Sequence, residues 1–146
     1  MKLSIKEIPC VEDEEVIVRC VNKNEKWVDA IKSIASGEVT VKGYLEDKIY
    51  HIKLSDIYYF EVVEGRSFIY CDKSVFECKL KLYEFENLCK GSMLFRCSKS
   101  CILNINKIQY VRPSFSGRFE AMLNNNEKII ISRQYVGDLK RMLECL

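Results

Sequence analysis

The chain has 146 residues, of which 48% are hydrophobic and 30% charged, so it is too short for two ordinary domains and is not disordered or low in complexity. No apolar run approaches the roughly 18 residues that cross a bilayer, and the start lacks a signal-peptide core, so we expect a cytoplasmic protein without a membrane partner. The formal net charge of +2 is too small to identify a nucleic-acid binder by itself.

The first 44 residues predict two strands and one helix. The segments 3–8 and 15–21 are rich in Ile and Val and predict strands. Asn24 is a candidate N-cap for a helix that ends at Gly37. Its apolar face contains Trp27, Ile31, Ile34 and Ala35. We expect residues 1–44 to be an N-terminal extension that either extends the core or forms a dimer surface.

From residue 39 onward the pattern is a succession of short strands joined by polar turns. The predicted strands are 39–45, 48–54, 57–63, 68–71, 75–79, 93–97, 101–105, 108–112, 118–123 and 127–131. Two more helices are predicted, one closed at Gly91 and one capped by Ser132. The apolar faces of these helices are Leu82, Phe85, Leu88 and Cys89, and Tyr135, Val136, Leu139 and Leu143. The chain is therefore expected to be mainly β, with ten or eleven strands and three helices.

Cysteine is abundant, but nothing in the sequence directs secretion, so we expect free thiols rather than a disulfide scaffold. The eight are Cys10, Cys20, Cys71, Cys78, Cys89, Cys97, Cys101 and Cys145. There is no C-x-x-C pair, and His51 is the only histidine, so we expect no metal and no cofactor. No nucleophile elbow or phosphate loop is present, which argues against an enzyme and a small-molecule substrate. Cys97 adjoins basic residues that could make it a redox sensor, although a buried apolar role is favoured.

Basic and polar residues interrupt the apolar strand pattern at four places. These are Arg66-Ser67, Ser98-Lys99-Ser100, Ser116-Gly117-Arg118 and Arg133-Gln134. Such side chains can contact DNA phosphates and base edges, but they also occur in ordinary solvated turns. The spacing of these residues alone favours solvated turns. The charge distribution makes the later part of the chain the better candidate for DNA contact. Residues 1–46 contain seven Lys/Arg against nine Asp/Glu, and residues 47–146 contain sixteen against twelve.

Three blocks of sequence resemble the LytTR DNA-binding domain family. They are Asp56–Glu61, Phe95–Ile108 and Ile131–Tyr135, and the resemblance extends over about residues 45–143. The middle block is the most specific, because it fills every named letter of F-R-x-x-x-S-x-x-x-N-x-x-x-I. The resemblance implies a fold of small, mostly antiparallel β-sheets in a row with about three short helices.

The resemblance also implies a function, which is sequence-specific binding of double-stranded DNA at promoter direct repeats, with loops in successive major grooves. Carried over by position, the DNA-contacting residues are Arg66 or Ser67 in the first loop, Ser98 and Lys99 in the second, and Arg133 or Gln134 in the third, with Arg118 as a supporting phosphate contact. The preferred base sequence cannot be transferred, because relatives differ in the first two loops.

These expectations define the DNA-binding domain as residues 45–146. The preceding segment is too short for a receiver domain, so we expect a stand-alone transcription regulator, with a homodimer as an open possibility. A protein interaction module without DNA binding is the main alternative, and a single-strand RNA binder is the other.

Overall fold

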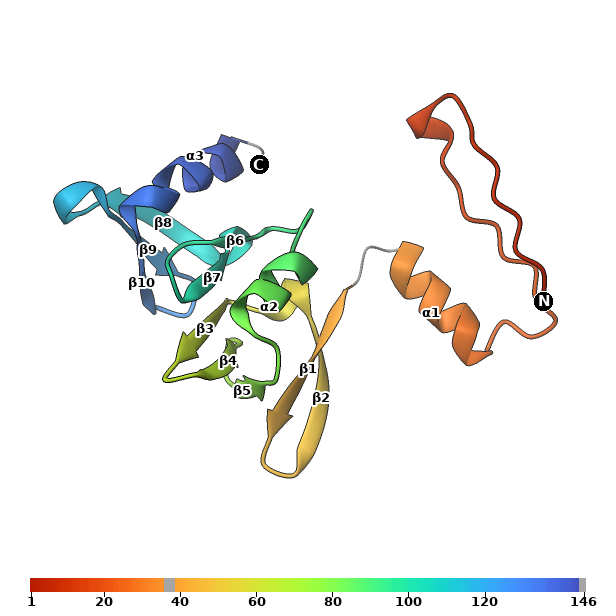
Figure 1. Ribbon diagram of the computed structural model, residues 1–146, viewed down its shortest axis with the longest axis horizontal. Helices are drawn as coiled ribbons and strands as arrows, with labels where there is room; N and C mark the ends of the chain where they lie inside the picture. Colours follow the sequence, from red (N-terminus) through yellow and green to blue (C-terminus); the bar gives the residue numbers. More distant parts are fainter. Residues whose placement is uncertain (36–38, 145–146) are drawn as a thin grey trace. The chain divides into compact units, whose positions relative to one another are not determined.

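A computed structural model of the protein describes residues 1–35 and 39–144, with the side chains at positions 29, 30, 33 and 34 left aside. The helix end predicted at Gly37 and the cysteine at position 145 therefore lie outside the described residues. The chain forms two compact units, residues 1–38 and Val39–Leu146, which are shown in Figure 1 and are described separately.

The first unit contains one α-helix, α1 (Lys26–Ala35), and a short 3-10 turn, η1 (Val11–Asp13). The helix was predicted, but the two strands at 3–8 and 15–21 are wrong: no strand forms within residues 1–35. A strand needs a partner for its backbone N–H and C=O groups, and these extended segments do not form a ladder with each other. The predicted cap is also wrong, because Asn24 lies two residues ahead of the helix and donates its backbone N–H to the Asn22 side chain.

The second unit is built on two antiparallel sheets. The larger has the strand order β2-β1-β5-β4-β3-β7-β6, and the smaller has the order β10-β9-β8. The strands are β1 Thr40–Leu45, β2 Lys48–Lys53, β3 Tyr59–Val63, β4 Arg66–Tyr70, β5 Val75–Cys78, β6 Leu94–Arg96, β7 Cys101–Asn104, β8 Ile108–Pro113, β9 Phe119–Leu123 and β10 Lys128–Ile131. Each agrees with a predicted strand to within a few residues.

Two α-helices cover these sheets, α2 (Leu82–Leu88) and α3 (Val136–Glu144). Short 3-10 turns connect the strands. They are η2 Leu54–Asp56, η3 Ile105–Lys107, η4 Phe115–Gly117 and η5 Arg133–Tyr135. The side chain of Glu84 accepts a hydrogen bond from the backbone N–H of Lys81 and so caps α2. In α3, Leu139 is buried but Leu143 is exposed, so the predicted apolar face is wrong at its last position.

The second unit has two hydrophobic cores, one on each side of β7. In the first core, α2 packs on the larger sheet, and the rings of Phe85 and Phe60 stack with centroids 4.1 Å apart. In the second core, the smaller sheet and α3 pack against the other face of β3, β6 and β7, around Leu103 and Leu139. Because both faces of β7 are covered, all four of its residues are buried, which explains its unbroken apolar run.

Packing in the larger sheet depends on a glycine in β1. A Cβ atom added at Gly43 would collide with the side chains of Ile52 and Phe76. Only glycine permits this approach of neighbouring strands. The observed architecture is mainly β, with antiparallel sheets and three helices among the described residues, as the sequence predicted.

Candidate nucleic-acid interface

The first candidate residue, Arg66, lies at the start of β4, directly after the turn that joins β3 to β4. Its side chain is 63% exposed and makes a two-pronged ion pair with Glu77 on β5, with Nε–Oε1 and Nη2–Oε2 distances of 3.1 and 2.9 Å. The guanidinium lies 5.4 Å from the centroid of the Phe68 ring. The hydrogen bond from Arg66 lowers the pKa of Glu77 below its usual value. Arg66 is thus accessible but already paired.

Ser67, the other candidate in this hairpin, is only 7% exposed. The sequence predicted that both residues lie in the turn, and this is wrong, because both belong to β4. The turn itself consists of Glu64 and Gly65, which both have positive φ angles. Side chains alternate along a strand, so Arg66 and Ser67 face opposite sides of the sheet.

The second candidate loop, Ser98–Ser100, joins β6 to β7 and is held from behind by Arg96. The Nε of Arg96 donates to the carbonyl oxygen of Ser98 at 2.6 Å, and its Nη2 donates to the carbonyl oxygen of Lys99 at 2.7 Å. Its Nη1 donates to Glu86 of α2 at 2.7 Å. One guanidinium therefore fixes the two successive peptide groups that carry the candidate side chains.

The side chains of this loop differ in exposure: Lys99 is exposed, whereas Ser98 is half-buried. The Oγ of Ser98 accepts a hydrogen bond from the backbone N–H of Ser100, so one of its hydrogen-bonding positions is already used within the loop. Lys99 is accordingly the side chain of this loop that is best presented to a partner. The sequence singled out Lys99 but not Arg96, although Arg96 is the R of the F-R-x-x-x-S pattern.

The third group of candidates gathers around one hollow. A shallow depression of about 520 Å³ is lined by Ser116, Arg118, Ser132, Arg133 and Gln134. Arg118, Arg133 and Gln134 are all exposed. The structure thus brings together the two segments that the sequence treated as the third loop and its supporting phosphate contact.

A glycine allows the two segments of this hollow to meet. Gly117 has a φ angle of +75°, and a Cβ added there would lie 3.3 Å from both Cγ and Cδ of Arg133. The aliphatic part of the Arg133 side chain therefore rests against the backbone of Gly117. Any larger residue at this position would meet both a strained backbone and a displaced arginine.

Backbone hydrogen bonds link the second candidate loop to β3 on one side and to the third group of candidates on the other. We call the candidate segments together the loop edge: Arg66, Ser98–Ser100, Ser116–Arg118 and Ser132–Gln134. The N–H of Val62, which pairs with Ser67, donates to the carbonyl of Ser100 at 2.9 Å. On the other side of the second loop, the N–H of Ser132 donates to the carbonyl of Cys97 at 2.8 Å. In Figure 1 the tip of the β3–β4 hairpin and the β8–β9 loop both lie toward the left of the second unit.

The cysteines beside the second loop lie in the core. Cys97 and Cys101 are 0% and 6% exposed, and all seven described cysteines are free thiols, as expected. The pKa of Cys101 is raised well above its usual value by its interaction with Cys97 and by burial. Cys97 and Cys101 therefore behave as small buried apolar residues rather than as reactive thiols.

The single histidine of the sequence, His51, is an exposed residue of β2.

Asn104, the N of the middle block, has a structural role. It is 2% exposed, and its Nδ2 donates to the carbonyl of Ile57 at 2.9 Å while its Oδ1 accepts from the backbone N–H of Asn106 at 3.0 Å. It thereby ties β7 to the segment that precedes β3.

Comparison with known proteins identifies the family. The model of the LytTr DNA-binding domain matches residues 47–144, which is more than half of the chain. The chain belongs to the LytTR DNA-binding domain family. Its second unit is therefore a LytTR DNA-binding domain, and the resemblance found in the sequence is confirmed.

Similar proteins include named regulators. The sensory transduction protein LytT of Enterococcus faecalis is 30% identical over 138 residues, covering 90% of this chain and 56% of that protein. The transcriptional regulatory protein YpdB of Escherichia coli K12 is 26% identical over 105 residues, covering 71% of this chain and 43% of that protein. The chain thus spans about half the length of these relatives. The match to LytT covers more than the second unit alone contains, so it reaches into the first unit.

A solved structure has the same fold. The LytTr DNA-binding domain of a putative methyl-accepting/DNA response regulator from Bacillus cereus has a TM-score of 0.68 and 24% sequence identity, covering 73% of this chain and 98% of that one. The expected LytTR fold is therefore confirmed.

Within residues 1–35 and 39–144, no helix combines the length and apolar character needed to span a membrane. In the same part of the chain, no group of three His, Cys, Asp or Glu side chains could hold a metal ion.

Proposed function

We propose that this protein is a sequence-specific regulator of transcription that binds double-stranded DNA at direct repeats in promoters, with the loop edge facing successive major grooves. The observation that carries the proposal is the set of backbone hydrogen bonds along that edge, from Val62 to Ser100 and from Ser132 to Cys97. A reader of DNA must hold its contacts in fixed relative positions, because base pairs offer donors and acceptors at fixed spacing.

Different side chains take different parts of this binding. Arg133 and Lys99 read base edges, because both are exposed and both adjoin backbone that hydrogen bonds fix in place, at Ser132 and at the Lys99 carbonyl. Arg118 and Ser132 hold phosphates beside Arg133, and Gln134 offers an amide to either target. Arg66 joins the contact once it leaves Glu77, whereas buried Ser67 supports the hairpin from inside.

Regulation follows from occupancy of the promoter by this protein rather than from a catalysed reaction. Binding at a promoter changes the access of RNA polymerase, and it takes place in the cytoplasm, where bacterial promoters are found. Two copies on adjacent repeats bind cooperatively, with residues 1–44 extending the domain or joining the copies as a homodimer. This part of the proposal rests on the exposed apolar residues of the first unit, such as Leu3 and Ile5, which are 87% and 83% exposed.

Selection of bound duplexes from a random pool, followed by sequencing, tests the proposal. Enrichment of a spaced direct repeat is the expected result, together with binding that weakens steeply as salt rises, since phosphate contacts release counterions. Recovery of no common sequence and no salt-dependent retention on duplex DNA would instead favour a protein interaction module.

A further inference from the structure

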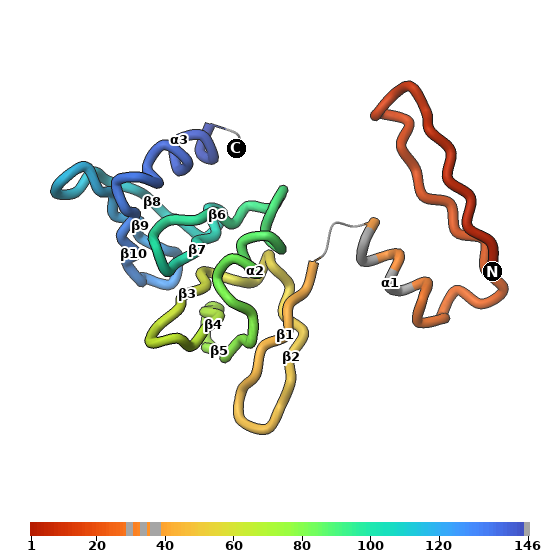
Figure 2. The backbone as a smooth tube through the Cα atoms, in the orientation of Figure 1, coloured from red at the N-terminus to blue at the C-terminus, as the bar shows by residue number. Residues whose placement is uncertain are grey.

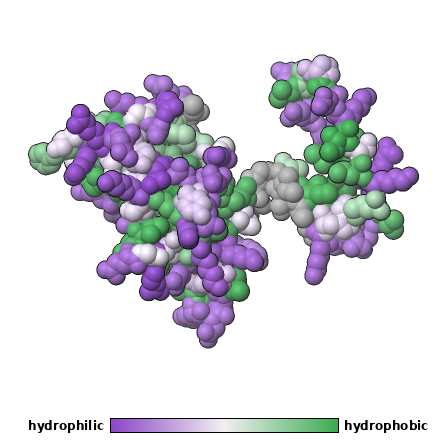
Figure 3. Space-filling model, in the orientation of Figure 1, coloured by the Kyte–Doolittle hydropathy of each residue, from purple (hydrophilic) through white to green (hydrophobic). Residues whose placement is uncertain are grey.

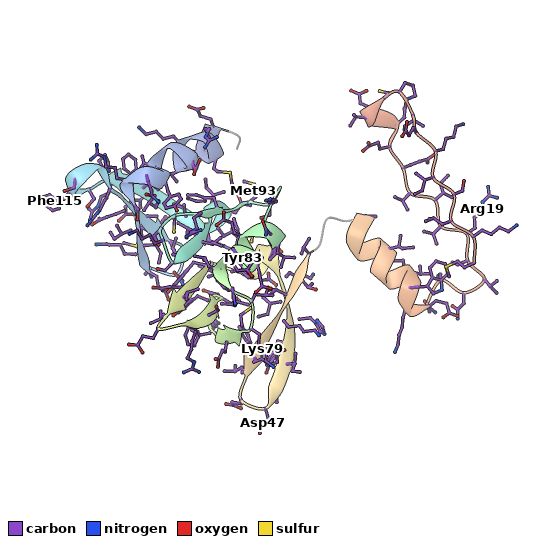
Figure 4. All side chains as sticks on the ribbon, in the orientation of Figure 1. Arg19, Asp47, Lys79, Tyr83, Met93 and Phe115 are labelled. Carbon is purple, nitrogen blue, oxygen red and sulfur yellow. The ribbon has the colours of Figure 1, made fainter. Side chains whose placement is uncertain are left out.

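An exposed phenylalanine stands beside the cationic hollow of the loop edge. Phe115 is 88% exposed, and it begins the η4 turn that leads to Gly117 and Arg118. Figure 4 labels it at the left extreme of the second unit, pointing away from the cores, and Figure 3 shows an apolar projection there among hydrophilic side chains. A phenylalanine this exposed contributes little to folding and leaves a large apolar ring in water.

The loop that carries Phe115 is closed by its own hydrogen bonds. The N–H of Ser114 donates to the carbonyl of Arg118 at 2.8 Å, and the N–H of Arg118 donates to the carbonyl of Phe115 at 3.2 Å. Between them, Ser116 has a φ angle of 59°, in the left-handed region that L-residues rarely adopt. Figure 2 shows this segment, in blue, projecting from the ends of β8 and β9. The ring is therefore displayed by a tight, defined turn.

The surroundings of the ring favour a polyanion. Phe115 also lines a second depression with Arg112 and Glu120. There the Glu120 carboxylate lies 2.7 Å from Arg112 and 3.9 Å from Lys128, so two cations offset its negative charge. The hollow of the loop edge is lined by Arg118 and Arg133, and no Asp or Glu among the described residues lines it with them. An apolar ring next to an excess of positive charge fits a polyanion that also exposes apolar groups between its charged backbones.

Duplex DNA is such a partner, because the C5-methyl group of thymine is the apolar feature of the major groove. We infer that Phe115 is a specificity-determining residue that packs on a thymine methyl next to the bases read by Arg133. This inference rests on the proposed function. It adds a preference for thymine at one position of each half-site that depends on the methyl group, which the polar candidates cannot recognise by hydrogen bonds.

The test measures binding of the whole chain to duplexes selected from a random pool, with each thymine of the site replaced in turn by deoxyuridine, which lacks the methyl group. For the unchanged protein we expect about a fourfold loss at one thymine, the value of burying one methyl group. F115A should bind the thymine duplex more weakly and should show no further loss with uracil at that position. F115L, which keeps an apolar side chain, should retain part of the methyl effect.

Two controls separate this inference from the proposed function. R133A should lose affinity on both duplexes and keep its sensitivity to uracil, and Y83A removes an aromatic ring that is 62% exposed on α2, so it should bind as the unchanged protein does. If R133A weakens while F115A binds normally or keeps the full uracil effect, the thymine contact is wrong and the proposed function stands. If neither the protein nor its variants bind duplex DNA specifically, the proposed function itself fails. A loss in F115A that appears only when two sites are occupied would assign Phe115 to a contact between proteins and would also overturn the inference.

Discussion

The guanidinium of Arg96 holds the carbonyl oxygen of Ser98 at 2.6 Å, and with its remaining nitrogens it reaches Lys99 and Glu86. The side chain is only 26% exposed, and it also lies 5.8 Å from the ring centroid of Tyr135, next to the third group of candidates. One partly buried residue therefore connects the second loop to α2 and to the entrance of α3.

Replacing Arg96 by lysine should disorder the second loop without unfolding the domain. A lysine keeps the charge but cannot donate to three acceptors from one planar group. We expect a loss of about 1.5 to 3 kcal/mol in stability, the range for hydrogen bonds to charged groups, and weaker specific DNA binding. Urea unfolding and gel shifts with R96K and R96A measure both effects. Equal stability and affinity in R96K would show that the bridging geometry has no role.

Removing the partner of Arg66 should strengthen DNA binding. In E77Q the arginine loses its ion pair and is released for a phosphate or base, so affinity should rise by at most about fivefold, as for an exposed ion pair. The gain should shrink at high salt. D47N is the matched control, because Asp47 is an exposed carboxylate in the β1–β2 turn at the lower end of Figure 4. A similar gain in D47N would mean that net charge alone is responsible.

Removing the amide of Asn104 should destabilise the domain. N104A leaves the buried carbonyl of Ile57 without its donor and the N–H of Asn106 without its acceptor, at a cost of about 1 to 3 kcal/mol. The midpoint of chemical denaturation measures the loss. Surface variant N124A, in the β9–β10 turn, provides a comparison in which no buried side chain is removed. Unchanged stability in N104A would contradict a structural role for this residue.

The domain should lose stability in alkaline solution. Burial raises the pKa of Cys71 to about 11 and that of Cys89 to about 12, from an ordinary value of 9.0. The unfolded chain therefore releases these protons first, so the stabilisation is complete below pH 9 and is lost as pH rises from 9 toward 11 and 12. Urea midpoints under reducing conditions should fall over this window.

The matched variant for this prediction is C71A/C89A, in which the fall should be shallower. Cys78, Cys101 and Tyr59, whose pKa values are also raised in the folded protein, still titrate in the variant and keep a residual slope. A midpoint that stays level from pH 8 to pH 11 in the unchanged protein would contradict the assignment of buried, neutral thiols.

Periodicity predicted the second unit well because each strand lies against one of two cores. The alternating or continuous apolar runs from Thr40 to Ile131 record which faces are covered, and turn residues mark where strands end. The same reasoning failed in the first unit. Leu3–Ile8 has strand composition, but composition cannot supply the neighbouring strand that its backbone needs.

The candidate residues were proposed from the sequence pattern and the family resemblance, but the contacts that surround them could not be predicted in this way. No local pattern reveals that Arg66 is paired with Glu77, eleven residues away, or that Arg133 lies on Gly117. Such contacts depend on strand order and on loop conformation. The burial of Ser67 could have been anticipated, because two neighbouring residues at the start of a strand point to opposite faces.

The most direct test of the account is the affinity of R133A for the selected duplex, measured by gel shift beside its thermal melting temperature. We expect an unchanged melting temperature and a loss of about 1 to 3 kcal/mol in specific binding, as for removal of a bidentate base contact. A folded R133A protein that binds the same duplex with undiminished specificity would contradict the placement of the loop edge on DNA.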